Sequence, residues 1–178
     1  MRVDPRERVR RLVEANVDDL FAYFARRVRV RDDAADLIGE TMLVVWRRSA
    51  DVPTDDTAAR MWMFGIARRV LMNHERGRRR RSALADRVSD RLVDDLASGP
   101  TVDDFDELRT AVHALPPKQR EVVLLVYGEG FTLAEASTVM RASASTTRSR
   151  HAYALAALRA RVGVVLPGSL ATQPIGTA

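Results

Sequence analysis

Cysteine is absent from this sequence of 178 residues, which excludes a disulfide framework and any site built on thiolate ligands. No apolar run approaches the length that crosses a membrane, and the charged N-terminus lacks the apolar core of a signal peptide. We therefore expect a cytoplasmic protein that makes no membrane contact.

Motifs for catalysis and for cofactor binding are missing as well. His74, His113 and His151 are far apart in the sequence and show no metal-type spacing. No glycine-rich loop of the kind that holds phosphates or dinucleotides is present. The carboxylates lie in polar segments, where a solvated surface explains them better than acid–base chemistry. The sequence therefore predicts neither an enzyme nor a bound cofactor or metal.

Positive charge comes almost entirely from arginine, because Lys118 is the only lysine among 29 basic residues. Arginine suits bidentate contacts with phosphate and guanine, although the codon bias of a GC-rich genome explains much of its abundance. The net charge is +5, and no acidic residue follows Glu135. Residues 86–107, by contrast, hold eight carboxylates against two arginines. Such segregation favours a polyanionic partner.

Apolar residues recur at helical spacing, and no sustained alternation indicates a strand, so we predict an all-α protein. The first half should form three helices: one through Val9–Val28, one from a cap at Asp32 or Asp33 to Trp46, and one from about Thr57 into the arginine run 76–81.

The second half should begin after an acidic linker. Residues 82–104 include Ser98-Gly99-Pro100 and show only weak periodicity. A helix restarts at Phe105 and stops at Pro116-Pro117, and another spans Lys118–Tyr127. Thr132 and Glu135 fit a capping box, and Ser143 can cap a last helix that reaches about Val162. The uncharged tail from Gly163 is expected to be disordered.

The stretch from Leu115 to Arg159 has the order of a helix-turn-helix preceded by a supporting helix. A recognition helix presents its N-terminal side chains to DNA, which here are Thr146, Arg148, Ser149 and Arg150. The alternative is a helical hairpin in a bundle whose arginines are simply solvated.

A second basic helix lies nearer the N-terminus. Trp62 stands just ahead of four polar or basic residues, Arg68, Arg69, Asn73 and Arg76. Aromatic groups beside cations can hold unstacked bases, as in proteins that bind single strands. Taken alone, Trp62 at helical spacing from Ile66 and Val70 is better explained as a core residue.

Together the two units resemble the extracytoplasmic-function (ECF) sigma factors of bacterial RNA polymerase. DDAADLIGETMLVVWRR resembles the segment that docks on the polymerase β′ subunit, which implies that Asp36, Glu40, Thr41, Trp46 and Arg47 bind the core enzyme. ARMWMFGIARRVLMNHERGRRRR resembles the segment that melts and reads the −10 element. LPPKQREVVLLVYGEGFTLAEA and TTRSRHAYALAALR resemble the helix-turn-helix that reads the −35 element.

The resemblance implies two small helical domains joined by a flexible linker: sigma domain 2 in residues 1–82, the acidic linker in 83–104, sigma domain 4 in 105–162 and a tail in 163–178. It also implies three partners, namely the β′ and β subunits of core polymerase, promoter DNA and an anti-sigma factor. Promoter elements roughly 25 base pairs apart lie about 85 Å apart, which one chain with a linker of about 20 residues can span.

Three departures from the family pattern concern folding and specificity. Gly39 replaces a glutamine of the polymerase-binding segment, and Arg141 replaces the glycine of the turn, a position that often requires positive φ. Ala142, Thr147 and His151 replace larger apolar residues. We therefore expect the C-terminal helices to fold loosely on their own, or −35 specificity to have drifted. The alternative functions are a free-standing helix-turn-helix regulator and a protein-interaction module.

Overall fold

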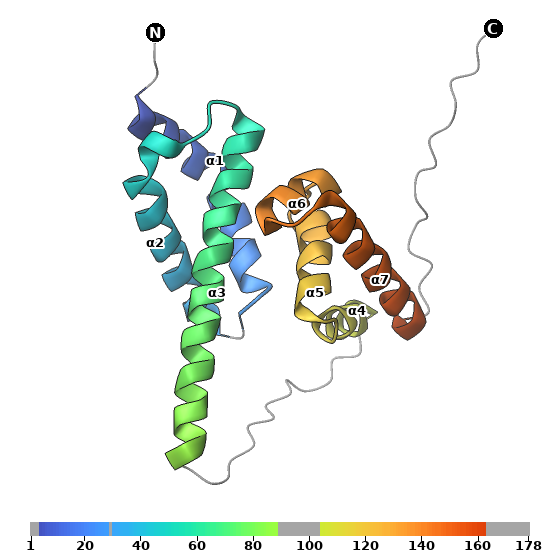
Figure 1. Cartoon of the computed structure of the whole chain (residues 1–178). Coiled ribbons are helices and arrows are strands. Elements are labelled where there is room, and N and C mark those ends of the chain that lie inside the picture. The colour runs from blue at the N-terminus through green and yellow to red at the C-terminus, as the bar shows by residue number, and fades with distance from the viewer. Residues whose placement is uncertain (1–3, 29, 89–103, 163–178) are drawn as a thin grey trace, which may run out of the picture.

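The computed structural model describes residues 4–28, 30–88 and 104–162, and these form helices without any strand (Figure 1). The N-terminal unit, residues 4–88, contains α1 (Pro5–Ala25), α2 (Arg31–Arg47), a 3₁₀ turn η1 (Ser49–Asp51) and α3 (Asp56–Val88). The C-terminal unit, residues 104–162, contains α4 (Asp104–His113), α5 (Pro117–Val123), a π-helical turn η2 (Leu124–Gly128), α6 (Leu133–Met140) and α7 (Ala144–Val162).

The predicted all-α fold with two helical units is confirmed. Helix α3 continues to Val88, past residue 82, where the sequence predicted the linker to begin. Most of the predicted linker and the whole tail, residues 163–178, lie outside the described residues.

Local capping explains where most helices begin. Asp4 accepts a hydrogen bond from the backbone N–H of Arg6 at 3.0 Å, and Pro5 occupies the first helical position of α1. The predicted capping box of Thr132 and Glu135 is formed at the start of α6. Ser143 Oγ accepts from the backbone N–H of Thr146 at 3.1 Å, so the predicted cap of α7 is confirmed.

The predicted cap of α2 at Asp32 or Asp33 is wrong. The N-cap is Val30, whose side chain makes no capping hydrogen bond, because the helix already begins at Arg31. Both aspartates therefore lie inside the first turn, where their negative charge interacts favourably with the helix dipole.

The turn between α6 and α7 has the conformation that its position in the sequence predicted. Arg141 adopts φ 52° and ψ 47°, in the left-handed region where glycine is the usual residue. Its backbone N–H still satisfies a carbonyl of α6, that of Thr138, at 3.1 Å. The turn is thus formed in spite of the arginine, at the expense of backbone strain.

The two units share one hydrophobic core. In Figure 1, α3 runs between α2 on one side and the C-terminal helices on the other, α1 crosses behind it, and the C-terminal end of α3 projects beyond the other helices. The shared core contains fully buried aromatic side chains of the N-terminal unit and several side chains of the C-terminal unit: Tyr23, Phe24, Phe64, Val122, Leu125, Phe131 and Val139. A second, smaller cluster joins α4, α5 and α7 through Ala111, Leu115, Val123, Ala154 and Leu158.

Candidate nucleic-acid interface

Helix α3 presents a polar, basic surface beyond the core. Arg69, Asn73 and Arg76 are exposed and spaced by four and three residues, so they lie on one side of the helix, which we call the α3 face. The arginine run 76–81 follows on the half of α3 that projects from the other helices (Figure 1). Such a row of cations with an amide suits contact with a nucleic-acid backbone and base edges.

The other two residues predicted for the −10 element lie closer to the protein interior. Trp62 is half-buried against the shared core, and its indole N–H is buried without a hydrogen-bond partner among the described residues. Arg68 is half-buried, and its Nε lies 3.8 Å from Glu121 Oε1 on the C-terminal unit. Trp62 therefore packs on the shared core and Arg68 faces the C-terminal unit, whereas the α3 face is open to solvent.

Helix α2 carries the residues predicted to bind the polymerase. Asp36, Glu40 and Arg47 are exposed, and together with Leu43, which is 59% exposed, they recur at spacings of four, three and four residues. We call this row the α2 face. Trp46 beside it is 50% exposed. Sequence reasoning missed Leu43, although an apolar residue at helical spacing between Glu40 and Arg47 was the available signal.

Thr41 differs from the other residues predicted for polymerase binding. Its side chain is fully buried, and its hydroxyl donates to the carbonyl of Leu37 at 2.7 Å. In this structure Thr41 therefore holds α2 against the core and offers no surface to a partner.

The start of α7 collects the residues predicted for the −35 element. Thr146, Arg148 and Ser149 are exposed and Arg150 is half-buried, and we call these four residues the α7 start. Ser143 Oγ lies 2.7 Å from the Thr146 hydroxyl, which holds that side chain beside the cap. The unpaired backbone N–H groups and dipole of a helix N-terminus favour an anionic ligand such as a DNA phosphate.

Thr147 and His151 of α7, which replace larger apolar residues of the family pattern, make polar contacts in this structure. Thr147 is fully buried, and its hydroxyl donates to the carbonyl of Ser143 at 3.1 Å. His151 stacks on Tyr127 with ring centroids 5.7 Å apart, and its Nε2 lies 3.1 Å from the tyrosine hydroxyl. Burial lowers the pKa of His151, which favours the neutral imidazole in that contact.

Two residues of the α7 start, Thr146 and Arg150, and Arg68 of α3 line one cleft of about 310 Å³ between the two units. Its other cationic residues, Lys118 and Arg141, come from the start of α5 and from the turn. The sequence predicted two separate DNA-reading surfaces and gave no sign that members of both would meet.

The described residues contain no group of three His, Asp or Glu side chains arranged to hold a metal ion. Within the same ranges, no helix is long and apolar enough to cross a membrane.

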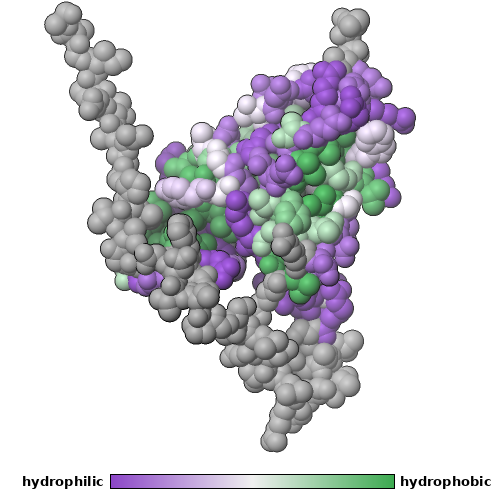
Figure 2. All heavy atoms as spheres, turned by 180° about the vertical axis from the view of Figure 1, so that it is seen from behind, coloured by the Kyte–Doolittle hydropathy of each residue, from purple (hydrophilic) through white to green (hydrophobic). Residues whose placement is uncertain are grey.

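Exposed apolar and hydrophilic areas alternate over the face seen from behind (Figure 2). Leu43, Trp46 and Tyr153 are among the exposed large apolar side chains.

Comparison with known proteins agrees with this division into two units. The family model of sigma-70 region 2 matches residues 12–81, and that of sigma-70 region 4 matches residues 111–160. One match falls in each unit. The fold and the two matched regions thus define a sigma-70-type transcription initiation factor.

Similar proteins narrow the class. SigF of Caulobacter vibrioides, an ECF sigma factor, is 37% identical over 148 residues, which is 80% of this chain and 79% of that protein. EcfG of Rhodopseudomonas palustris, another ECF sigma factor, is 30% identical over 121 residues, 67% of this chain and 65% of that protein. The chain belongs to the ECF sigma factors. Like them, it directs RNA polymerase to promoters.

A solved structure shows the same fold. The sigma factor RpoE of Bartonella quintana, in complex with the anti-sigma factor NepR, matches with a TM-score of 0.71 at 21% identity, over 88% of this chain and 98% of that one. The likeness extends over both helical units.

Proposed function

We propose that three exposed surfaces divide the work of this sigma factor. The α2 face and Trp46 bind core polymerase, the α3 face with Trp62 and Arg68 opens and reads the −10 region, and the α7 start reads the −35 element. The observation that carries the proposal is that each unit presents its own solvent-exposed helix surface with arginine beside hydrogen-bonding side chains. On this basis the N-terminal unit is sigma domain 2 and the C-terminal unit is sigma domain 4.

Promoter opening in this proposal needs no covalent chemistry and no cofactor. Unpaired bases bind better than paired ones to aromatic and cationic side chains, so binding itself favours the melted state. Phosphate contacts from arginines add affinity that falls with salt concentration. Thr41 contributes from inside by holding α2 against the core.

The proposal includes an anti-sigma partner in the cytoplasm. Its support is the resemblance of both units, in fold, to a sigma factor that was solved bound to an anti-sigma factor. We expect a partner of this kind to cover surfaces on both units.

Run-off transcription on genomic DNA of the source organism, followed by sequencing of the 5′ ends, tests the proposal. Core polymerase with the chain should start transcripts downstream of a shared pair of sequence elements, and core polymerase alone should not. Arg148→Ala should reduce discrimination at the −35 element by about 1–3 kcal/mol if Arg148 reads a guanine. Arg161→Ala, an exposed arginine at the far end of α7, is the matched control and should change nothing.

Two results would contradict the proposal. Footprints on duplex DNA in the absence of core polymerase would favour a free-standing regulator instead. Unchanged transcription from every promoter with Arg148→Ala would remove Arg148 from the −35 surface.

A further inference from the structure

One large aromatic side chain of α7 takes no part in the packing of the helices. Tyr153 is 68% exposed, the highest value among the large apolar side chains that the described residues expose. Within the same part of the chain it makes no hydrogen bond, ring contact or cation–π contact. Single exposed apolar residues are common on protein surfaces, so the position of Tyr153 on α7 decides what its exposure means.

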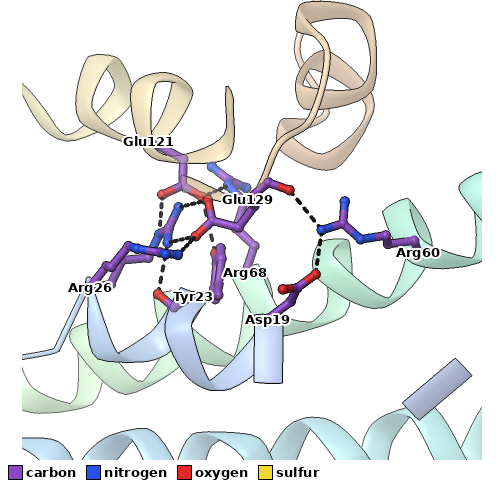
Figure 3. Close-up of polar contacts among 8 residues, drawn as sticks. Asp19, Tyr23, Arg26, Arg60, Arg68, Glu121 and Glu129 are labelled. Carbon is purple, nitrogen blue, oxygen red and sulfur yellow. Dashed lines mark hydrogen bonds and ion pairs between the residues drawn. The ribbon is translucent and has the colours of Figure 1, made fainter. Parts of the chain in front are cut away.

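Other prominent side chains on the exposed surfaces do have partners. Tyr127 stacks on His151, and the Arg6 guanidinium lies 5.9 Å from the centre of the Trp46 ring. Arg68, assigned above to the −10 region, points toward Glu121 of the C-terminal unit (Figure 3). Tyr153 differs from these residues, because both its ring and its hydroxyl are available to a ligand.

Helical spacing places Tyr153 in line with the α7 start. Ala154 and Leu158 are buried and four residues apart, which marks the side of α7 that packs on its own unit. Tyr153 follows Thr146 by seven residues and Ser149 by four, so all three lie on another side, which is exposed. Tyr153 therefore extends the α7 start by one turn.

The residues around Tyr153 are small. Ser149 and Ala157 lie one turn before it and one turn after it, and Ala152 precedes it directly. The phenol ring therefore stands above a low helix surface that a DNA groove can approach closely. No acidic residue follows Glu135 in the sequence, so α7 carries no carboxylate that would repel the phosphates.

The reach and the chemistry of Tyr153 differ from those of the α7 start. Seven residues of helix rise by about 10.5 Å, which corresponds to about three base pairs of DNA. Tyr153 therefore reaches a different base pair from Thr146. Arginine binds guanine and phosphate, whereas an aromatic ring in the major groove packs on the apolar group that the groove offers, the C5 methyl group of thymine.

We propose that Tyr153 is a specificity-determining residue of the −35 surface, whose ring packs on the methyl group of one thymine in the −35 element. This rests on the proposed function, in which the α7 start reads that element. The contact adds a preference for thymine that the arginines and hydroxyls of the α7 start do not supply, because an apolar surface is needed to distinguish a methyl group from a hydrogen atom.

Uracil substitution in the −35 element tests the role of Tyr153. Deoxyuridine pairs with adenine as thymidine does and lacks only the methyl group, and it replaces one thymine of the element at a time. Core polymerase with the unchanged chain should bind one of these promoters about threefold to fivefold more weakly than the natural promoter. Tyr153→Ala should remove this dependence, and Tyr153→Phe, which keeps the ring, should retain it.

The matched control is Tyr127→Ala, which removes the other exposed tyrosine of the C-terminal unit and should keep the ratio between thymine and uracil promoters. Circular dichroism checks that each variant stays helical. Equal binding to every uracil promoter, or a dependence that survives Tyr153→Ala, would overturn the role of Tyr153. Loss of the dependence in Tyr153→Phe would overturn it as well, because the hydroxyl and not the ring would then make the contact.

Transcription separates this role from the proposed function. Promoter-directed transcripts that depend on Arg148 but not on the thymine methyl group would overturn the role of Tyr153 alone. Absence of promoter-directed transcripts with the unchanged chain would count against the proposed function, and the role of Tyr153 would fall with it.

Discussion

The two units differ in how they are held together. The N-terminal unit has a core of large side chains that are fully buried, among them Leu20, Tyr23, Phe24 and Phe64. The cluster private to the C-terminal unit is made of smaller residues, and the remaining apolar side chains of that unit are buried against α3 and its neighbours. The C-terminal unit thus takes part of its stability from contact with the N-terminal unit, whereas the N-terminal unit is stabilised mainly by its own core.

This difference has a functional consequence. A unit that depends on a neighbour for burial can be released when another surface, protein or DNA, replaces that neighbour. The N-terminal unit, which presents the α2 and α3 faces, keeps its shape in either state. Four predictions test this comparison, from the largest expected effect to the smallest.

Truncation in the core of the N-terminal unit should have the largest effect. Phe24→Ala removes a fully buried ring and should lower the free energy of unfolding by about 3–5 kcal/mol. Because the C-terminal unit packs on this core, both units should lose hydrogen-exchange protection. Val17→Ala, at a position of the same helix that is 39% exposed, should cost less than about 0.5 kcal/mol. Equal effects of the two changes would contradict the comparison.

Truncation in the private cluster should act locally. Leu158→Ala removes a side chain that is 3% exposed and contacts a small group of residues, so we expect a loss of about 2–3 kcal/mol. Hydrogen exchange should speed up in α4 and α7 while α1 to α3 stay protected. Uniform loss of protection in both units would show that they unfold as one body.

Replacing the strained residue of the turn should stabilise the C-terminal unit. Arg141→Gly places glycine at φ 52° and should raise the free energy of unfolding by about 0.5–1 kcal/mol, since the left-handed strain is relieved. The same change at Arg78, an exposed position inside α3, should lower it by about 1 kcal/mol. Thermal melts of both variants show whether each change raises or lowers the free energy of unfolding. Destabilisation by Arg141→Gly would contradict this interpretation of the turn.

Acidification should weaken the C-terminal unit slightly through His151. Its folded pKa is lowered by burial, so below the ordinary histidine pKa of about 6.5 the unfolded chain binds more protons than the folded one. Stability is therefore fully present above that pH and falls as the pH drops through it. His151→Gln should flatten the fall in melts between pH 7 and pH 5, and Tyr127→Phe should retain it. An unchanged slope in His151→Gln would assign the fall to other groups.

Much of the fold was predictable from local sequence. The capping box at Thr132 and the cap at Ser143 each depend on a few neighbouring residues, whose chemistry decides the backbone. The left-handed conformation of Arg141 was expected because the family pattern has glycine at that position. The start of α2 was predicted at the aspartates and lies at Arg31, because helix starts without a side-chain cap leave no distinctive residue in the sequence. The resemblance to the ECF sigma factors indicated most residues of the α2 and α3 faces.

The contact between the units was not predictable in the same way. Arg27 Nε donates to Glu121 Oε2 at 3.0 Å across the two units. The two residues are 94 positions apart, and arginines and glutamates are too frequent in this chain for any one pair to stand out. Periodicity shows that a helix has an apolar side without showing which helix covers it. The burial of Thr41 was not predictable from the sequence either. A small polar residue can lie in a core when its hydroxyl donates to a carbonyl of its own helix, as Thr41 does to Leu37.

The most direct test of the account compares one distance in two states of the same molecule. The chain has no cysteine, so Ala35→Cys on α2 and Ala156→Cys on α7, both exposed positions, provide unique sites for two dyes. With dyes at these positions, the free chain should show high fluorescence transfer. The complex with core polymerase and promoter DNA should show almost none, because the promoter elements lie about 85 Å apart. High transfer that persists in a transcriptionally active complex would show that the packed arrangement itself reads the promoter, and would contradict the account.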